Sequence, residues 1–145
     1  MHLLFIVSIF VLFFAPTSAE LLAKTQSIAV KGIITCDEQV PKNIKIQLWD
    51  VDRTDPDDLI VEGSLDENGE FFLQGSETEF STIDPELRII HKCGDEGVEC
   101  FRQTIIDIPD DYITDGESPI KTFDAGNINL RVIPNTETSE CYWSD

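Results

Sequence analysis

The sequence predicts an all-β domain, a two-sheet antiparallel sandwich of seven or eight strands that follows a cleaved N-terminal signal peptide. Three observations predict it. Short segments alternate apolar and polar residues at period two, which favours half-buried strands over helices. Turn-forming residues separate these segments, and four cysteines form an even set.

The N-terminus carries an apolar run typical of export. Residues 3–15 are apolar or small apart from Ser8, and Thr17 and Ala19 are small residues that suit a signal peptidase. A permanent span needs about 20 apolar residues, so an uncleaved anchor is the weaker alternative. We expect cleavage after Ala19, a domain over residues 20–145, and a location in the extracellular region or at the cell surface.

The strands are predicted in order along the chain. The first strand places alternate residues from Ile28 to Cys36 on one face. The second places Ile46 and Leu48 on one face and Lys45 and Gln47 on the other. The predicted strands cover residues 28–36, 44–48, 59–64, 70–74, 87–92, 103–108, 121–123 and 127–133.

Turn residues lie between these strands. Asn68-Gly69 tolerates positive φ angles and predicts a tight hairpin. Pro85, Pro109 and Pro119 mark strand ends, because proline cannot donate to a central ladder. Gly94 and Gly97 favour a loop over a short helix between the cysteines at 93 and 100. The polar residues 135–140 predict a loose tail.

The cysteines are Cys36, Cys93, Cys100 and Cys141. An even set in an exported chain favours two disulfides over thiol chemistry, and the absence of a C-x-x-C pair disfavours a zinc site. Three pairings are open. The preferred one joins Cys93 with Cys100, across a short loop, and Cys36 with Cys141.

The chain is strongly acidic, with 28 Asp and Glu against 10 Lys and Arg and a net charge of −18. Such a surface repels phosphate groups, so nucleic acid and anionic membranes are disfavoured as partners. A solvated surface is the favoured interpretation, and a site for cations or for a basic partner is the alternative.

Several short motifs together resemble the secreted transthyretin-like family of nematodes. They are Val30-Lys31-Gly32 with Cys36, Val40-Pro41, Asp57-Asp58-Leu59, Asp66-x-Asn68-Gly69-x-Phe71, Gly75-x-Glu77-x-Glu79, Asp84-Pro85-x-Leu87, Ile90-His91-x-Cys93, Ile108-Pro109-x-x-Tyr112 and Asp124-x-Gly126-x-Ile128-Asn129-Leu130. The resemblance implies a transthyretin-like (prealbumin-like) sandwich outside the cell. At least one member of that family is assigned phosphatidylserine binding and receptor bridging. The sequence departs from the family in having four residues, not three, between Cys36 and Pro41.

Catalysis is disfavoured. Transthyretin's enzyme relatives hydrolyse 5-hydroxyisourate with two His, an Arg and a C-terminal Tyr-Arg-Gly-Ser, whereas His91 is the one histidine after residue 19 and the chain ends Cys-Tyr-Trp-Ser-Asp. Because His91 shares a predicted strand face with Leu87 and Ile89, a structural role is expected for it. We expect no catalytic residue and no cofactor.

Two groups of residues are candidate binding sites. One is a set of aspartates between two predicted strands: Asp50, Asp52, Asp55, Asp57 and Asp58. Their carboxylates could offer hard oxygen ligands to Ca²⁺, although an exposed loop is the favoured interpretation. The segment around Asn68-Gly69 lacks the final Glu of an EF-hand and is interpreted as a turn. The other group combines aromatic and polar side chains, a composition that protein–protein interfaces favour. It consists of Asp111, Tyr112, Tyr142 and Trp143.

The leading functional hypothesis is a secreted, non-enzymatic binding or adaptor protein whose partner is an extracellular protein or lipid. The alternatives are a carrier of small apolar ligands, which requires a defined oligomer, and a Ca²⁺- and phospholipid-dependent bridging protein.

Overall fold

The computed structural model describes residues 22–94, 97, 101–132 and 137–142, with the backbone alone described from residue 137. The predicted signal peptide therefore lies outside the described residues. Within the described ranges, no helix is long and apolar enough to cross a membrane.

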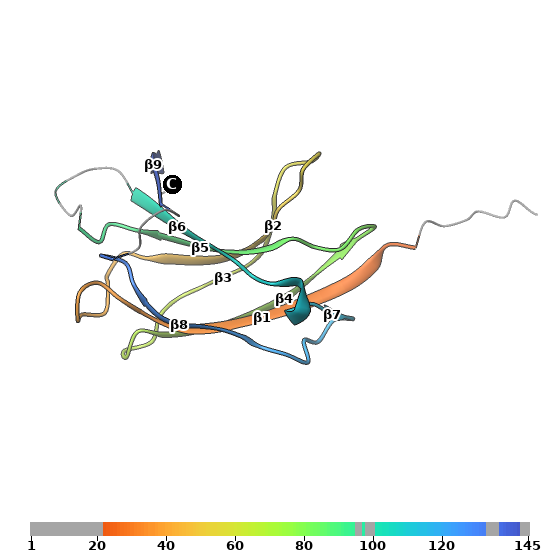
Figure 1. Cartoon of the computed structure of the whole chain (residues 1–145), viewed down its shortest axis with the longest axis horizontal. Coiled ribbons are helices and arrows are strands. Elements are labelled where there is room, and N and C mark those ends of the chain that lie inside the picture. The colour runs from red at the N-terminus through yellow and green to blue at the C-terminus, as the bar shows by residue number, and fades with distance from the viewer. Residues whose placement is uncertain (1–21, 95–96, 98–100, 133–136, 143–145) are drawn as a thin grey trace, which may run out of the picture.

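The chain folds into two layers of β-sheet (Figure 1), which confirms the predicted sandwich. One sheet has the order β4-β1-β7, with β8 also paired to β1, and the other has the order β3-β2-β5-β6-β9. The elements are β1 (Lys24–Thr35), β2 (Lys45–Asp50), β3 (Asp58–Gly63), β4 (Glu70–Glu79), β5 (Pro85–His91), β6 (Phe101–Asp107), the 3₁₀ turn η1 (Asp110–Tyr112), β7 (Thr114–Asp115), β8 (Phe123–Asn129) and β9 (Glu137–Tyr142).

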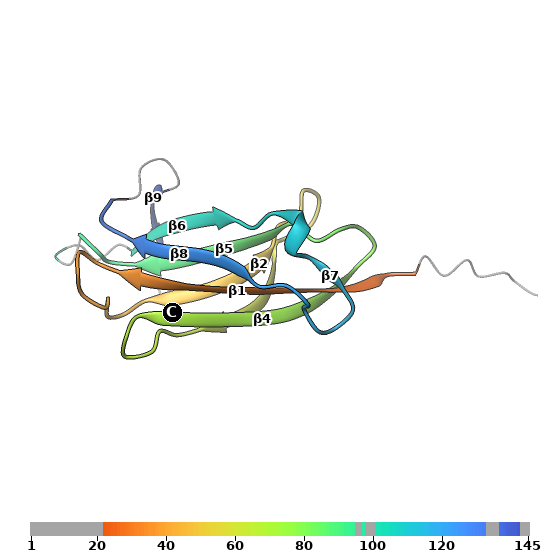
Figure 2. The same cartoon turned by 60° about the horizontal axis from the view of Figure 1, so that its bottom comes forward.

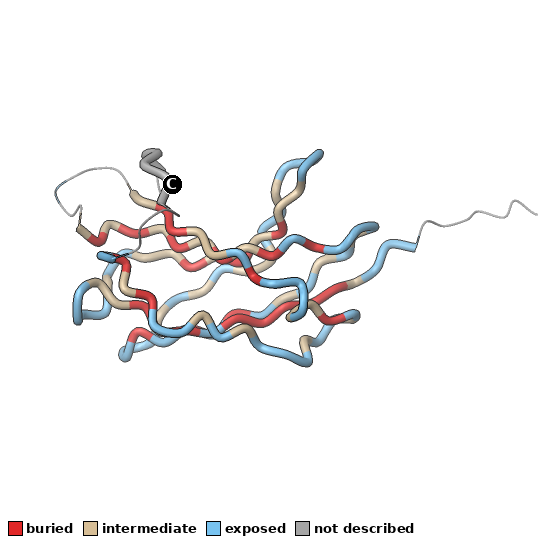
Figure 3. Tube along the Cα trace, viewed as in Figure 1, coloured by how far each residue is buried: buried red, intermediate tan, exposed pale blue. Residues whose placement is uncertain are grey.

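The faces predicted from alternation are the faces that form the core. Ile28, Val30 and Ile34 of β1 are fully buried, and so are the apolar residues of β2 and β5 on the facing sheet: Ile46, Leu48, Leu87 and Ile89. Figure 3 shows these buried segments running along the strands of both layers. Burial of the alternating apolar residues is what holds the two sheets together.

Strand β1 lies between β4 and β8 (Figure 2). It pairs antiparallel with β4 but parallel with β8. The predicted antiparallel sandwich is thus confirmed, with this one parallel pair as an exception. Strand β8 is also a single strand where two short ones were predicted, because backbone pairing to β1 continues through its polar middle residues.

The turn at Asn68-Gly69 forms, but it is not a hairpin between paired strands. The Gly69 N–H donates to the Asp66 carbonyl at 3.1 Å, and Gly69 has a φ of 81°. The turn nevertheless connects β3 in one sheet to β4 in the other. A dipeptide that favours positive φ predicts a turn, whereas the identity of the paired strands depends on tertiary packing.

Strands also form in segments where the pattern did not predict them, among them the short β7. Strand β4 continues to Glu79 although its second half is polar, because each of its residues pairs with the first half of β1. The tail expected to be loose contains β9, which pairs antiparallel with β6 and forms the edge of that sheet.

The disulfide prediction was wrong. The structure joins Cys36 to Cys93, with 5.7 Å between their Cα atoms. This bond excludes both preferred pairs, Cys93 with Cys100 and Cys36 with Cys141. Cys36 directly follows β1 and Cys93 lies just beyond β5, so the bond connects the two sheets at one end of the sandwich. Cys100 lies outside the described residues.

Candidate functional site

Three carboxylates gather at one end of the sandwich, away from the disulfide. One oxygen from each of Asp50, Asp52 and Glu79 lies within 4.8 Å of the other two. We call these three side chains the carboxylate cluster. Asp50 ends β2 and Glu79 ends β4, so the cluster is assembled from both sheets.

Strand alternation explains why these side chains meet. Along β2 the buried positions are Ile46, Leu48 and then Asp50, so Asp50 occupies the last core-facing position. Along β4 the buried Phe71 and Leu73 belong to the same face as Glu79. Both strands therefore end with an acidic side chain on the face that points between the sheets.

Asp50 has the most enclosed carboxylate of the cluster. Asp50 is only 2% exposed, and its Oδ1 accepts a hydrogen bond from the Asp84 N–H at 2.7 Å. Its Oδ2 is buried and has no hydrogen-bond partner among the described residues. A buried acceptor that lacks a partner costs roughly 1–3 kcal/mol, and more when it is charged.

Hydrogen bonds hold the backbone around the cluster. The Val51 N–H donates to the Asp84 carbonyl at 3.1 Å, which fixes the chain after β2 against the loop before β5. The buried Gln26 side chain donates to the Ser81 carbonyl at 2.7 Å and accepts from the Ile83 N–H at 3.3 Å. The loop beside the cluster is therefore fixed from the inside of the sandwich.

Burial and crowding of like charges raise the pKa of all three carboxyls. For Asp50, burial raises the pKa most, the hydrogen bond from Asp84 lowers it, and the charges of Asp52, Asp84 and Glu77 raise it further. Burial and then nearby acidic charges also raise the pKa values of Asp52 and Glu79. No ion pair among the described residues involves the cluster.

Replacing Asp50 by Asn is expected to raise the free energy of unfolding at pH 7, without divalent cations, by roughly 1 kcal/mol. The amide keeps the acceptor for Asp84 and removes a charge that faces Asp52, Glu77, Glu79 and Asp84. Because the folded-state pKa of Asp50 is raised, its ionisation destabilises the fold as the pH rises from about 4 through that pKa.

The gain from Asp50→Asn should therefore shrink as the pH falls towards about 4, as measured by urea unfolding of variant and wild type at each pH. Asp55→Asn in the exposed neighbouring loop makes the same charge change and should yield a smaller gain. An equal gain for the two variants would contradict a specific burial effect at Asp50.

The structure separates the five aspartates proposed as cation ligands. Asp50 and Asp52 belong to the cluster, whereas Asp57 pairs with Arg88 at 2.5 Å and accepts a hydrogen bond from the Asp52 N–H at 3.3 Å. Asp55 and Asp58 are exposed and lie outside the cluster. Glu79 was not predicted, because the second half of β4 is polar and carries no apolar alternation that would mark its inward face.

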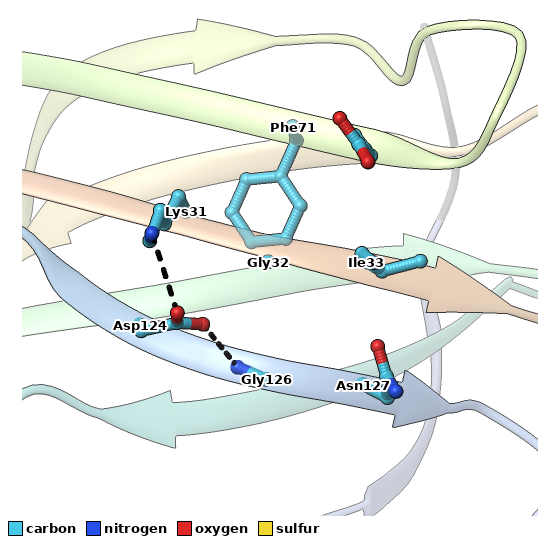
Figure 4. Close-up of a pocket in the computed structure, with 8 residues that line it drawn as sticks. Lys31, Gly32, Ile33, Phe71, Asp124, Gly126 and Asn127 are labelled. Atoms are coloured by element: carbon cyan, nitrogen blue, oxygen red, sulfur yellow. Dashed lines mark hydrogen bonds and ion pairs between the residues drawn. The ribbon is translucent and has the colours of Figure 1, made fainter.

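A shallow pocket lies on the sheet that contains β1 (Figure 4). It opens where the pairing of β1 and β8 shifts between Lys31 and Ile33. Lys31 and Asp124 form an ion pair of 3.4 Å across it, and Asp124 also accepts from the Gly126 N–H at 2.9 Å. These bonds lower the pKa of Asp124, the one from Gly126 most.

Gly32 leaves room for Phe71 beneath this pocket. A Cβ at Gly32 would lie 2.9 Å from the Phe71 ring and 3.1 Å from the Gly126 carbonyl oxygen. Because Lys31 and Asp124 are paired with each other, their contact beside this pocket is explained by the packing of β8 on β1.

The other predicted binding residues are dispersed. Tyr112 packs edge-on against Phe123, with ring centroids 5.1 Å apart, and is part of the margin of the core. Asp111 is exposed, and its carbonyl accepts from the Lys121 ammonium at 2.8 Å. Only the backbone of Tyr142 is described, in β9, and Trp143 lies outside the described residues.

His91 has the structural role predicted for it. It is fully buried on the same face of β5 as Leu87 and Ile89. Its Nδ1 accepts from the Cys93 N–H at 3.1 Å, so the neutral ring donates from Nε2 to Thr104 Oγ1, also at 3.1 Å. The imidazole therefore holds the chain that leads to the disulfide.

Comparison with known proteins relates the chain to one family. The sequence model of the Transthyretin-like family matches residues 31–109. Transthyretin-like protein 46 of Caenorhabditis elegans is 40% identical over 134 residues, which are 91% of this chain and 75% of that protein. Transthyretin-like protein 33 of the same organism is 39% identical over 118 residues, 81% of this chain and 82% of that protein.

A solved structure, a 9R-lipoxygenase from Cyanothece, matches 74% of this chain and 17% of its own, with a TM-score of 0.38 and 20% identity.

Proposed function

The chain belongs to the Transthyretin-like family, and from that premise we propose that it is a secreted, non-enzymatic binding protein that contacts an extracellular ligand through the acidic end of its sandwich. The apolar run of residues 3–15 supports export. The partner is an extracellular protein or lipid that carries positive charge or a bound cation at its contact.

The observation that carries the proposal is the carboxylate cluster. Its acceptor oxygens are incompletely paired among the described residues, and they are presented by two sheets that a disulfide and a buried core hold in place. Rigid elements that present unpaired polar groups lose little freedom on binding, which favours recognition. His91, by contrast, is buried and hydrogen-bonded in a structural role.

A capture experiment tests the proposal. The chain is expressed with its own N-terminus, and the product should be recovered from the medium beginning at Glu20. Immobilised on beads, this oxidised protein should retain a saturable partner from extracellular fluid or from cell surfaces at micromolar concentration. Absence of a saturable partner, or retention of the product inside the cell, would count against the proposal.

A matched pair of double variants locates the contact. Asp52→Asn with Glu79→Gln should weaken capture at least tenfold because it removes two charges of the cluster. Glu38→Gln with Glu67→Gln makes the same charge change at exposed turns of the opposite end and should leave capture unchanged. Equal loss in both double variants would reveal non-specific attraction to the acidic surface instead of a site.

A further inference from the structure

We propose that Asp50, Asp52 and Glu79 bind one Ca²⁺ ion, which bridges the ends of the two sheets. This inference rests on the proposed function in one respect: both place the binding site at the same end of the sandwich. It adds the identity of the ion that the cluster binds. Its test measures ion binding directly, so it can fail or succeed separately from capture of a partner.

The spacing of the three oxygens suits calcium. Ca²⁺ binds oxygen ligands at 2.3–2.6 Å, so two ligands of one ion lie at most about 5 Å apart. The oxygens of the cluster are all within 4.8 Å of one another, so one ion can lie between the three side chains. Mg²⁺ binds at about 2.1 Å and demands a near-ideal octahedron, so it tolerates less variation in the positions of the oxygens than Ca²⁺ does.

Asp50 supplies the second observation. Its Oδ2 is buried, has no partner among the described residues and belongs to a residue that is 2% exposed. The other carboxylate oxygen, Oδ1, accepts a hydrogen bond from the Asp84 N–H, which keeps the carboxylate from rotating out of the cluster. A buried carboxylate oxygen with no donor is explained when a cation occupies the position that it faces.

The basic side chains nearby do not fill this role. Lys24 is opposite Glu79 in the pairing of β1 with β4, and Arg53 follows Asp52 in the chain. Both are exposed, and neither forms an ion pair with the cluster in the part of the chain that the structure describes. Within the described ranges, the three carboxylates thus have no ion-pair partner.

The coordination that the cluster offers predicts modest affinity. Three carboxylates supply three to six oxygens, and because Asp52 and Glu79 are partly exposed, water can complete the six to eight that Ca²⁺ takes. Dissociation constants of about 0.1–1 mM are typical of extracellular calcium modules. A site of that affinity is largely occupied where the Ca²⁺ concentration is millimolar.

The test is calcium titration of the oxidised protein by isothermal calorimetry, together with thermal unfolding. One ion should bind per chain, and 10 mM Ca²⁺ should raise the Tm by about 4 °C relative to NaCl of equal ionic strength. Mg²⁺ should raise it less. A Tm that responds equally to Ca²⁺ and to NaCl of matched ionic strength would overturn the proposal, because it would show screening alone.

Matched variants identify the ligands. Asp50→Asn should abolish the calcium-induced shift, whereas Asp55→Asn, with the same charge change outside the cluster, should keep it. A second variant, Glu79→Gln at the more exposed side of the cluster, should weaken calcium binding at least tenfold. Loss of binding in Asp55→Asn equal to that in the cluster variants, or full binding by Glu79→Gln, would contradict the assignment.

Discussion

Removing the Cys36–Cys93 disulfide is expected to lower the free energy of unfolding by about 4 kcal/mol, the largest effect that we predict. The bond closes a loop with a sequence separation of 57, so its loss frees a long segment of the unfolded chain. It also connects the end of β1 in one sheet to the residues after β5 in the other. The shorter free loop in the unfolded chain and the link between the two sheets both raise the free energy of unfolding of the disulfide-bonded protein.

The measurement is urea unfolding of Cys36→Ala with Cys93→Ala against wild type under oxidising conditions. Wild type that has been reduced is the control, because it keeps both sulfur atoms and loses the covalent link. Similar losses in the double variant and the reduced protein would assign the effect to the link, although reduction acts on any other disulfide too. A loss in the double variant below about 1 kcal/mol would contradict the prediction.

Leu48→Ala is expected to lower the free energy of unfolding by about 3 kcal/mol, because a fully buried leucine leaves a cavity that the surrounding strands fill only in part. Leu48 lies opposite Leu87 on β5 and Val61 on β3 in the sheet register, so it is on an interior strand of its sheet. Neighbours on both sides are paired through the backbone and cannot move inward far.

The matched control is Leu59→Ala on β3 of the same sheet. Leu59 is 45% exposed, so the same truncation should cost less than about 1 kcal/mol in the same urea experiment. The two variants differ in burial and not in chemistry. Equal losses would show that burial does not control stability in this sheet.

The predicted strands were accurate where local pattern and burial agree. The alternation of Ile28, Val30 and Ile34 is a local property, and the structure buries those residues. The same pattern missed the second half of β4, where polar residues are kept in a strand by pairing with β1. Pairing partners are remote in sequence, so no local pattern reports them.

The candidate site was predicted in part for the same reason. Asp50 and Asp52 were chosen because they are acidic and close in sequence, and the structure places both in the cluster. Asp57 met the same criterion but is paired with Arg88, a residue on β5. Glu79 belongs to a different sheet and became part of the cluster only through the packing of β4 over β2.

Residue alternation and composition were enough to predict the two-layer fold, the core-facing residues of β1, β2 and β5 and the excess of acidic groups, because they are properties of neighbouring residues. Long-range packing set the pairing of Cys36 with Cys93, the parallel direction of β8 beside β1 and the proximity of Glu79 to Asp50. Each of these depends on which strand ends are brought together. That choice is made when both sheets bury their apolar faces against each other.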